Sequence, residues 1–161
     1  ALVAFIACGF PLGAQAATRI VALGASNTVG RGGASYPTEL QAMLRAKGYD
    51  VEIINAGVNG DTTADMLARL DAAVPTGPRL VLLNPANLND NKAGIRGQQA
   101  AYVGQIKAQL GARGIKMIVL PSFHSIGAKH TDSEHFGAEG YQAMATRILP
   151  EVMAALGSPH H

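Results

Sequence analysis

Four polar segments of the sequence carry the groups that acyl transfer requires. The segments are residues 24–28, 55–63, 87–90 and 124–135. The first offers a serine hydroxyl, the second glycine backbone N–H groups, the third asparagine amides, and the fourth histidines beside a carboxylate. A serine hydrolase needs a nucleophile, oxyanion donors, a base and a group that orients the base. The sequence therefore predicts this chemistry, provided that the fold brings the four segments together.

Ser26 is the candidate nucleophile, because it directly follows a predicted strand and its small neighbours leave the hydroxyl accessible. Taken alone, a serine in this position is more often a turn residue or a helix cap. The segment is not a nucleophile elbow, since Thr28 stands where Gly-x-Ser-x-Gly has its second glycine. It is not a phosphate-binding P-loop either, since no Gly-Lys-Ser/Thr follows.

The second and third segments could supply oxyanion donors. Gly57 and Gly60 lie at a strand-to-helix junction, where glycine lets the backbone approach a ligand and present its N–H groups. A tight turn with an aspartate cap explains the same residues equally well. In the third segment the amide of Asn89 could donate to an oxyanion, and Asp90 could cap the segment or orient a neighbour. Taken alone, that segment reads as a polar turn.

The fourth segment offers His124, His130 and His135 as candidate bases, with Asp132 as the orienting carboxylate. His124 follows the preceding strand most closely but has no nearby carboxylate. His130 is two residues from Asp132, a spacing at which side chains diverge. Asp132 is three residues before His135, and one helical turn can bring such a pair together. The spacing therefore favours His135.

The four segments follow predicted strands that alternate with predicted helices. The predicted strands are residues 19–23, 51–55, 80–83 and 116–120. The predicted helices are residues 35–47, 98–110 and 138–156, together with one that Asp61 caps. Continuous apolar strands between helices indicate a parallel sheet covered on both faces. We expect an α/β fold, namely a three-layer α/β/α sandwich with a small, mostly parallel, flavodoxin-like sheet, whose site lies at the carboxyl ends of the strands.

Composition bounds the class of protein. The 161 residues are 48% hydrophobic and 15% charged, with a formal net charge of +2. This suits one domain with a sizeable core and argues against disorder. The positive charges are scattered, so we expect no nucleic-acid partner. Trp is absent and aromatics make up 5%, which leaves little for a stacking platform. Beyond the N-terminal region no apolar run is long enough to span a membrane.

Residues 1–16 differ from the rest of the chain. They contain no charged side chain, begin with an apolar run and end in Ala14-Gln15-Ala16, a small-x-small pattern typical of signal peptidase sites. We expect a truncated signal peptide over 1–16, a single catalytic domain over 17–161, and export to the periplasm or beyond. A buried N-terminal strand or helix and a lipoprotein site at Cys8 are the alternatives. Since Cys8 is the single cysteine, cleavage would leave no disulfide, thiolate or cysteine–zinc chemistry.

The chain resembles the SGNH (GDSL-type) hydrolases over residues 18–156, with four blocks in the family's order. Gly24-Ala25-Ser26 is similar to the Gly-Asp-Ser block, with Ala25 in place of Asp. Residues 55–60 resemble the glycine block. Asn87-Leu88-Asn89-Asp90 is similar to Gly-x-Asn-Asp, with Asn87 in place of Gly, and Asp132 with His135 matches Asp-x-x-His. The stretch between the last two blocks is short, as in small secreted arylesterase and lysophospholipase-like members.

The resemblance implies a serine esterase that acts through an acyl-enzyme on small-molecule esters: short to medium acyl esters, aryl esters, lysophospholipids or thioesters. It implies that Ser26, Asp132 and His135 are catalytic, and that the N–H groups of Ser26 and Gly60 with the Asn89 amide form the oxyanion hole. It requires no metal and no cofactor. The Ala25 and Asn87 departures could lower activity without removing a catalytic group.

Other functions remain open at this stage. A carbohydrate O-acetylesterase or an acyltransferase would use the same residues. A flavodoxin-like FMN-binding module is a different class. The scarcity of aromatic residues disfavours it, and it would give no role to Asp132 and His135. The compactness of the chain favours short acyl groups, and the oligomeric state is left undetermined.

Overall fold

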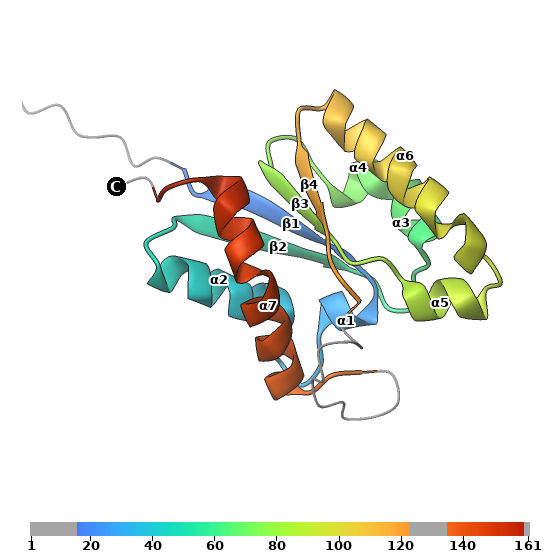
Figure 1. Cartoon of the computed structure of the whole chain (residues 1–161), viewed down its shortest axis with the longest axis horizontal. Coiled ribbons are helices and arrows are strands. Elements are labelled where there is room, and N and C mark those ends of the chain that lie inside the picture. The colour runs from blue at the N-terminus through green and yellow to red at the C-terminus, as the bar shows by residue number, and fades with distance from the viewer. Residues whose placement is uncertain (1–15, 123–134, 160–161) are drawn as a thin grey trace, which may run out of the picture.

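The structure, a computed structural model that describes residues 16–122 and 135–159, contains a parallel sheet between helices (Figure 1). In the described part of the chain, the sheet consists of four strands: β1 (Thr18–Gly24), β2 (Val51–Gly57), β3 (Leu80–Leu83) and β4 (Lys116–Val119). Their order is β2-β1-β3-β4, and every neighbouring pair is parallel. This order follows the flavodoxin-like pattern, so the predicted α/β fold is confirmed. Except for Ala16, the predicted signal peptide with Cys8 lies outside the described residues.

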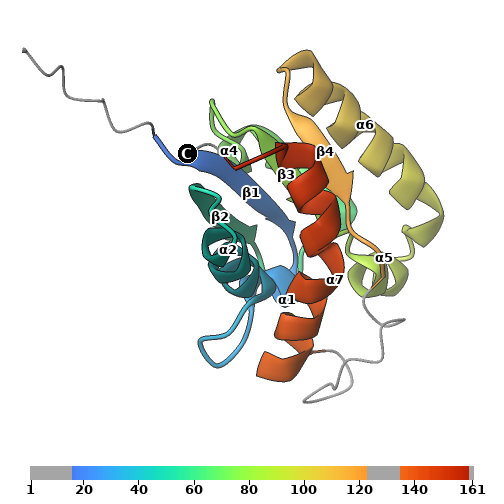
Figure 2. The same ribbon diagram turned by 60° about the vertical axis from the view of Figure 1, so that its left-hand side comes forward.

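Helices cover both faces of the sheet. They are α1 (Ser26–Val29), α2 (Tyr36–Ala46), α3 (Thr63–Ala68), α4 (Leu70–Ala73), α5 (Asn87–Lys92), the 3₁₀ turn η1 (Arg96–Gln98), α6 (Gln99–Ala112) and α7 (Ala138–Leu156). In Figures 1 and 2, α2 and α7 lie on one face and α3, α4 and α6 on the other, which gives the three predicted layers. None of the helices in the described ranges is both long and apolar enough to cross a membrane.

The strand β1 shows why the strands read as continuous apolar runs. Ile20 and Ala22 pack into the core under α2 and α7, whereas Val21 and Leu23 pack into the core under α3, α4 and α6. All four side chains are fully buried. Since successive residues of a strand point to opposite faces, a sheet covered on both sides needs apolar residues at every position.

The helix expected after Asp61 begins one residue later and is broken in the middle. Thr62 is the N-cap of α3: its hydroxyl accepts from the backbone N–H of Asp65, whose carboxylate accepts from the Thr62 backbone in return. The Thr62 hydroxyl and the Thr62 backbone N–H both donate to the Asp65 carboxylate, and these two hydrogen bonds lower the pKa of the Asp65 carboxyl. Arg69 then leaves helical geometry, at φ −102° and ψ 14°, and separates α3 from α4. The expected Asp61 cap is therefore wrong, because the Asp61 carboxylate bonds Arg69 instead.

The strand β4 departs from the expectation of a sheet covered on both faces. It ends at Val119 rather than at residue 120, and both Lys116 and Val119 are exposed. It lies at one end of the strand order, so one of its edges has no neighbouring strand in the described part of the sheet.

Candidate active site

The carboxyl ends of β1 and β3 lie side by side at the point where the strand order reverses direction. Chain connections leave this point toward β2 on one side and toward β4 on the other, so a crevice opens between them. Ser26 follows β1, and Asn89 follows β3. The topology therefore brings the first and third polar segments to one edge of the sheet.

Ser26 is the first residue of α1, a short helix that is not among the predicted helices. The turn closes because the backbone N–H groups of Thr28 and Val29 both donate to the carbonyl of Ala25. Gly24 permits this tight turn, since a Cβ there would lie 2.1 Å from the Thr28 hydroxyl oxygen. As the first helical residue, Ser26 has a backbone N–H without an intrahelical acceptor, so it can point at a ligand.

Polar contacts fix α1 against the end of β2. The Asn55 amide donates to the carbonyl oxygens of Thr28 and Val29, at 2.8 and 3.2 Å, and accepts from the Gly57 N–H at 3.0 Å. A Cβ on Gly57 would lie 2.5 Å from the Val29 nitrogen, so only glycine allows this approach. The element that carries Ser26 is thus held by groups other than the Ser26 side chain.

Gly60 lies in the loop between β2 and α3, and this loop is attached to the end of β1. The Val58 N–H donates to the Gly24 carbonyl at 3.0 Å. Gly60 has φ +83°, a conformation that favours glycine, while none of the described atoms outside Gly60 and its two chain neighbours lies within 4 Å of the position of an added Cβ. The backbone conformation, rather than a close neighbour, therefore explains the glycine.

Asn89 lies in α5, where the sequence indicated only a polar turn. Its Nδ2 donates to the Asp61 carbonyl at 2.7 Å. A primary amide carries two N–H donors, so one remains for a ligand while the other fixes the orientation of the group. Asn89 and Ser26 together border the hollows described below.

The carboxylate of Asp90 is fully buried and joins three helices. It accepts from the N–H and the hydroxyl of Thr63, both at 2.7 Å, and from the Gln99 amide at 2.6 Å. The Thr63 oxygen in turn accepts from the Ala86 N–H at 3.2 Å. Asp90 therefore orients α5 rather than reacting, and sequence reasoning missed its partners Thr63 and Gln99.

Replacing Asp90 with alanine is expected to lower the free energy of unfolding by about 3–5 kcal/mol, because it leaves three buried donors without an acceptor. Urea titration followed by circular dichroism measures this loss. Asp71→Ala is the control, since the Asp71 side chain is 94% exposed and a change within about 0.5 kcal/mol is expected. A loss below about 1 kcal/mol for Asp90→Ala would contradict the structural role.

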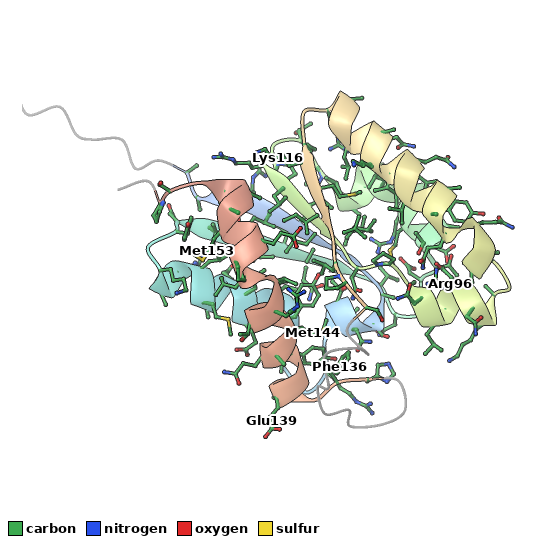
Figure 3. The ribbon with its side chains drawn as sticks, viewed as in Figure 1. Arg96, Lys116, Phe136, Glu139, Met144 and Met153 are labelled. Atoms are coloured by element: carbon green, nitrogen blue, oxygen red, sulfur yellow. The ribbon has the colours of Figure 1, made fainter. Side chains whose placement is uncertain are left out.

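His135 borders the same groove as Ser26, Gly60 and Asn89. The next residue, Phe136, is buried beside the first turns of α7 (Figure 3). Its ring meets that of Tyr141 edge-on, with centroids 6.3 Å apart and an interplanar angle of 69°. This aromatic contact anchors the chain directly after His135.

Three other predicted candidates, Asp132, His124 and His130, lie outside the described residues. The pairing of Asp132 with His135 therefore stays a prediction.

Two hollows meet at Ser26 and Asn89. One is a small cavity of about 60 Å³ with a polar wall that includes Asn27, Asn84 and Asn87. The other is an open groove of about 760 Å³ that also contains Gly60 and His135. Two of the residues that line the groove, Arg31 and Lys92, are positively charged. A nucleophile between two such hollows could hold the two halves of an ester on opposite sides.

The sequence is similar to those of known esterases and acylhydrolases. The sequence model of the GDSL-like Lipase/Acylhydrolase family matches residues 22–160. Esterase TesA of Pseudomonas aeruginosa is 37% identical over 86 residues, which are 50% of this chain and 41% of TesA, so the match spans about two fifths of that curated relative.

Solved structures show the same fold. A crystal structure of TesA superposes with a TM-score of 0.76 at 20% identity and covers 86% of this chain and 99% of that chain. AlinE4, an SGNH-hydrolase family esterase, superposes with a TM-score of 0.63 at 24% identity and covers 88% and 98%.

Proposed function

The chain belongs to the GDSL-like Lipase/Acylhydrolase family, and on this basis we propose that it is a serine esterase whose nucleophile is Ser26. The observation that carries the proposal is that Ser26, Gly60, Asn89 and His135 border one groove at the carboxyl edge of the sheet. The same assignment replaces the FMN-binding hypothesis, because the family is one of acylhydrolases.

The proposed reaction proceeds through an acyl-enzyme. His135 accepts the hydroxyl proton as the Ser26 oxygen attacks the ester carbonyl carbon, and Asp132 orients the imidazole. The N–H groups of Ser26 and Gly60 and the second amide hydrogen of Asn89 donate to the oxyanion. His135 then gives the proton to the departing alcohol, and water attacks the acyl-enzyme in a second, equivalent cycle that releases the acid.

Labelling with a serine-directed fluorophosphonate tests this assignment. We expect one phosphonyl group per chain, located on Ser26 by peptide mass spectrometry, with loss of p-nitrophenyl acetate hydrolysis in proportion to labelling. Full hydrolysis in fully labelled protein, or a label on another serine, would refute the role of Ser26.

The two hollows indicate how the substrate lies. His135 must reach the departing alcohol and borders only the open groove, so the alcohol occupies the groove and the acyl group the small cavity. An engineered cavity of about 150 Å³ in another protein holds benzene, so about 60 Å³ suits an acyl group of two or three carbons. This supports the preference for short acyl groups.

We therefore expect kcat/KM for p-nitrophenyl esters to fall at least about tenfold from acetate to octanoate, since overfilling a small pocket costs more than 1 kcal/mol. Asn87 lines the cavity. Asn87→Gly should therefore raise the ratio of kcat/KM for the hexanoate ester to that for the acetate ester about tenfold. Asn91→Gly is the matched control, because Asn91 is an exposed residue of the same helix outside the cavity wall. A rate that rises steadily from butyrate to palmitate would contradict the expectation.

An O-acetylesterase acting on carbohydrate is the second candidate. The observation that favours it is the contrast between an acetyl-sized cavity and a groove of about 760 Å³, which has room for a bulky polyhydroxylated alcohol. Release of acetate from acetylated oligosaccharides, at a kcat/KM above that for p-nitrophenyl acetate, distinguishes this activity from that of a simple arylesterase. Transfer of the acyl group to an added alcohol tests the acyltransferase alternative.

A further inference from the structure

We propose that Arg69 is a positioning residue for the oxyanion hole, acting through Asp61 on Gly60 and Asn89. This inference rests on the proposed function, because it takes Gly60 and Asn89 as the oxyanion donors. Arg69 does not border the groove and does not touch the substrate in this proposal.

The guanidinium of Arg69 joins three segments of the chain. Its Nε donates to Asp61 Oδ2 at 2.6 Å, and its Nη2 donates to the carbonyl oxygens of Ala56 at 2.9 Å and Gly24 at 3.3 Å. The ion pair is largely shielded, with the Arg69 side chain 23% exposed and the Asp61 side chain 11% exposed. One cation thus binds the carboxyl ends of β1 and β2 and the loop that precedes α3.

Asp61 connects Arg69 to two of the proposed oxyanion donors, Gly60 and Asn89. It directly follows Gly60 in the chain, and its own carbonyl accepts from Asn89 Nδ2 at 2.7 Å. The carboxylate of Asp61 therefore holds Arg69 while its backbone holds Asn89. A displacement of Asp61 would move the Gly60 N–H and the Asn89 amide together.

These donors must be accurately placed as well as present. Oxyanion donors act at about 2.7–3.1 Å from the developing charge, and a misplacement of about 1 Å can cost about 10²-fold in rate. Gly60 itself is exposed, and outside its two chain neighbours none of the described atoms lies within 4 Å of the position of an added Cβ. Its loop therefore depends on restraints at its two ends, and Arg69 supplies one of them.

The primary experiment compares Arg69→Ala with Arg113→Ala. Arg113 likewise donates to two backbone carbonyl oxygens, those of Val74 and Pro75, and forms an ion pair with the exposed carboxylate of Asp71. It precedes β4 and therefore lies at the amino ends of the strands, away from the groove. With p-nitrophenyl acetate, we expect Arg69→Ala to lower kcat by about 10²-fold with KM changed less than about threefold, and Arg113→Ala to leave kcat within about threefold.

Two further readouts separate positioning from a merely structural role. Guanidinium ion at a concentration well below its denaturing range should restore part of the kcat of Arg69→Ala but none of that of Asn89→Ala. Arg69→Lys keeps the charge but loses the planar fork, and it should lower kcat about tenfold while the melting temperature stays close to that of the parent. This variant keeps the test decisive if Arg69→Ala does not fold.

A double-mutant cycle tests whether Arg69 acts through Asn89. If both serve one oxyanion hole, the loss of kcat in Arg69→Ala/Asn89→Ala should fall short of the product of the single losses by at least about tenfold. Multiplicative losses, an unchanged kcat in Arg69→Ala and Arg69→Lys, or a loss confined to KM would overturn the inference. Full activity in Ser26→Ala or Asn89→Ala would instead overturn the proposed function itself, so the two failures are distinguishable.

Discussion

Replacing Ser26 with alanine is expected to lower kcat for p-nitrophenyl acetate by at least about 10⁴-fold while the fold stays intact. The chemical loss is large because no other group in the proposed mechanism can form the acyl-enzyme. The structural loss is small because α1 is held by the carbonyl of Ala25 and the amide of Asn55, not by the Ser26 hydroxyl.

The measurement pairs steady-state kinetics with far-ultraviolet circular dichroism and a melting curve. Ser158→Ala, at an exposed position beyond α7, is the matched control and should keep the parent rate. If Ser26→Ala retains more than a few per cent of activity with an unchanged spectrum, Ser26 is not the nucleophile.

The fold was predictable because burial on two faces leaves a direct record in the sequence. The strands β1, β2 and β3 lie at the expected positions, β1 and β3 as largely apolar runs, and α2, α6 and α7 begin and end within a few residues of the expected bounds. The strand ends then gave the location of Ser26 and Asn89 by a general rule for parallel sheets. Elements that depend only on residue type and hydrophobic period, such as these strands and the longer helices, could be predicted without the structure.

The short helices α1 and α5 were not predictable on the same grounds. Helices of one or two turns are marginal by themselves and depend on tertiary contacts. Residues 87–92 are mostly polar and show no apolar period, and α5 is held instead by bonds from Asn89 to Asp61 and from Thr63 to Asp90. These partners are more than 20 residues away along the chain, so no local pattern indicates them.

The choice between Asp61 and Thr62 as the helix cap shows the same limit. Both residue types are good caps, but Thr62-x-x-Asp65 has the spacing of a capping box, a signal that could have identified Thr62. The role of Asp61 depends on Arg69, whose other acceptors are backbone carbonyls. Since a carbonyl is present at every residue, a sequence carries no trace of such contacts.

Alanine variants of the three candidate histidines are expected to differ strongly in kcat. His135→Ala should lower kcat by about 10³-fold or more, the scale seen when the base of a catalytic triad is lost. His124→Ala and His130→Ala should each change kcat by less than about tenfold, a moderate effect for groups outside the proton path. The physical ground is placement: His135 borders the groove with Ser26, and buried Phe136 anchors it from the next position.

Measuring kcat for the three single variants, with added imidazole as a further arm, decides which histidine is the base. Imidazole should restore part of the activity of His135→Ala, because a small base can enter the space left beside Ser26, whereas a variant with a distorted loop gains nothing from it. Asp132→Asn should lower kcat by a factor similar to that of His135→Ala, since it removes the carboxylate that fixes the imidazole tautomer. If His124→Ala or His130→Ala is instead the inactive and imidazole-responsive variant, the base lies elsewhere in residues 124–135, and the pairing of Asp132 with His135 is wrong.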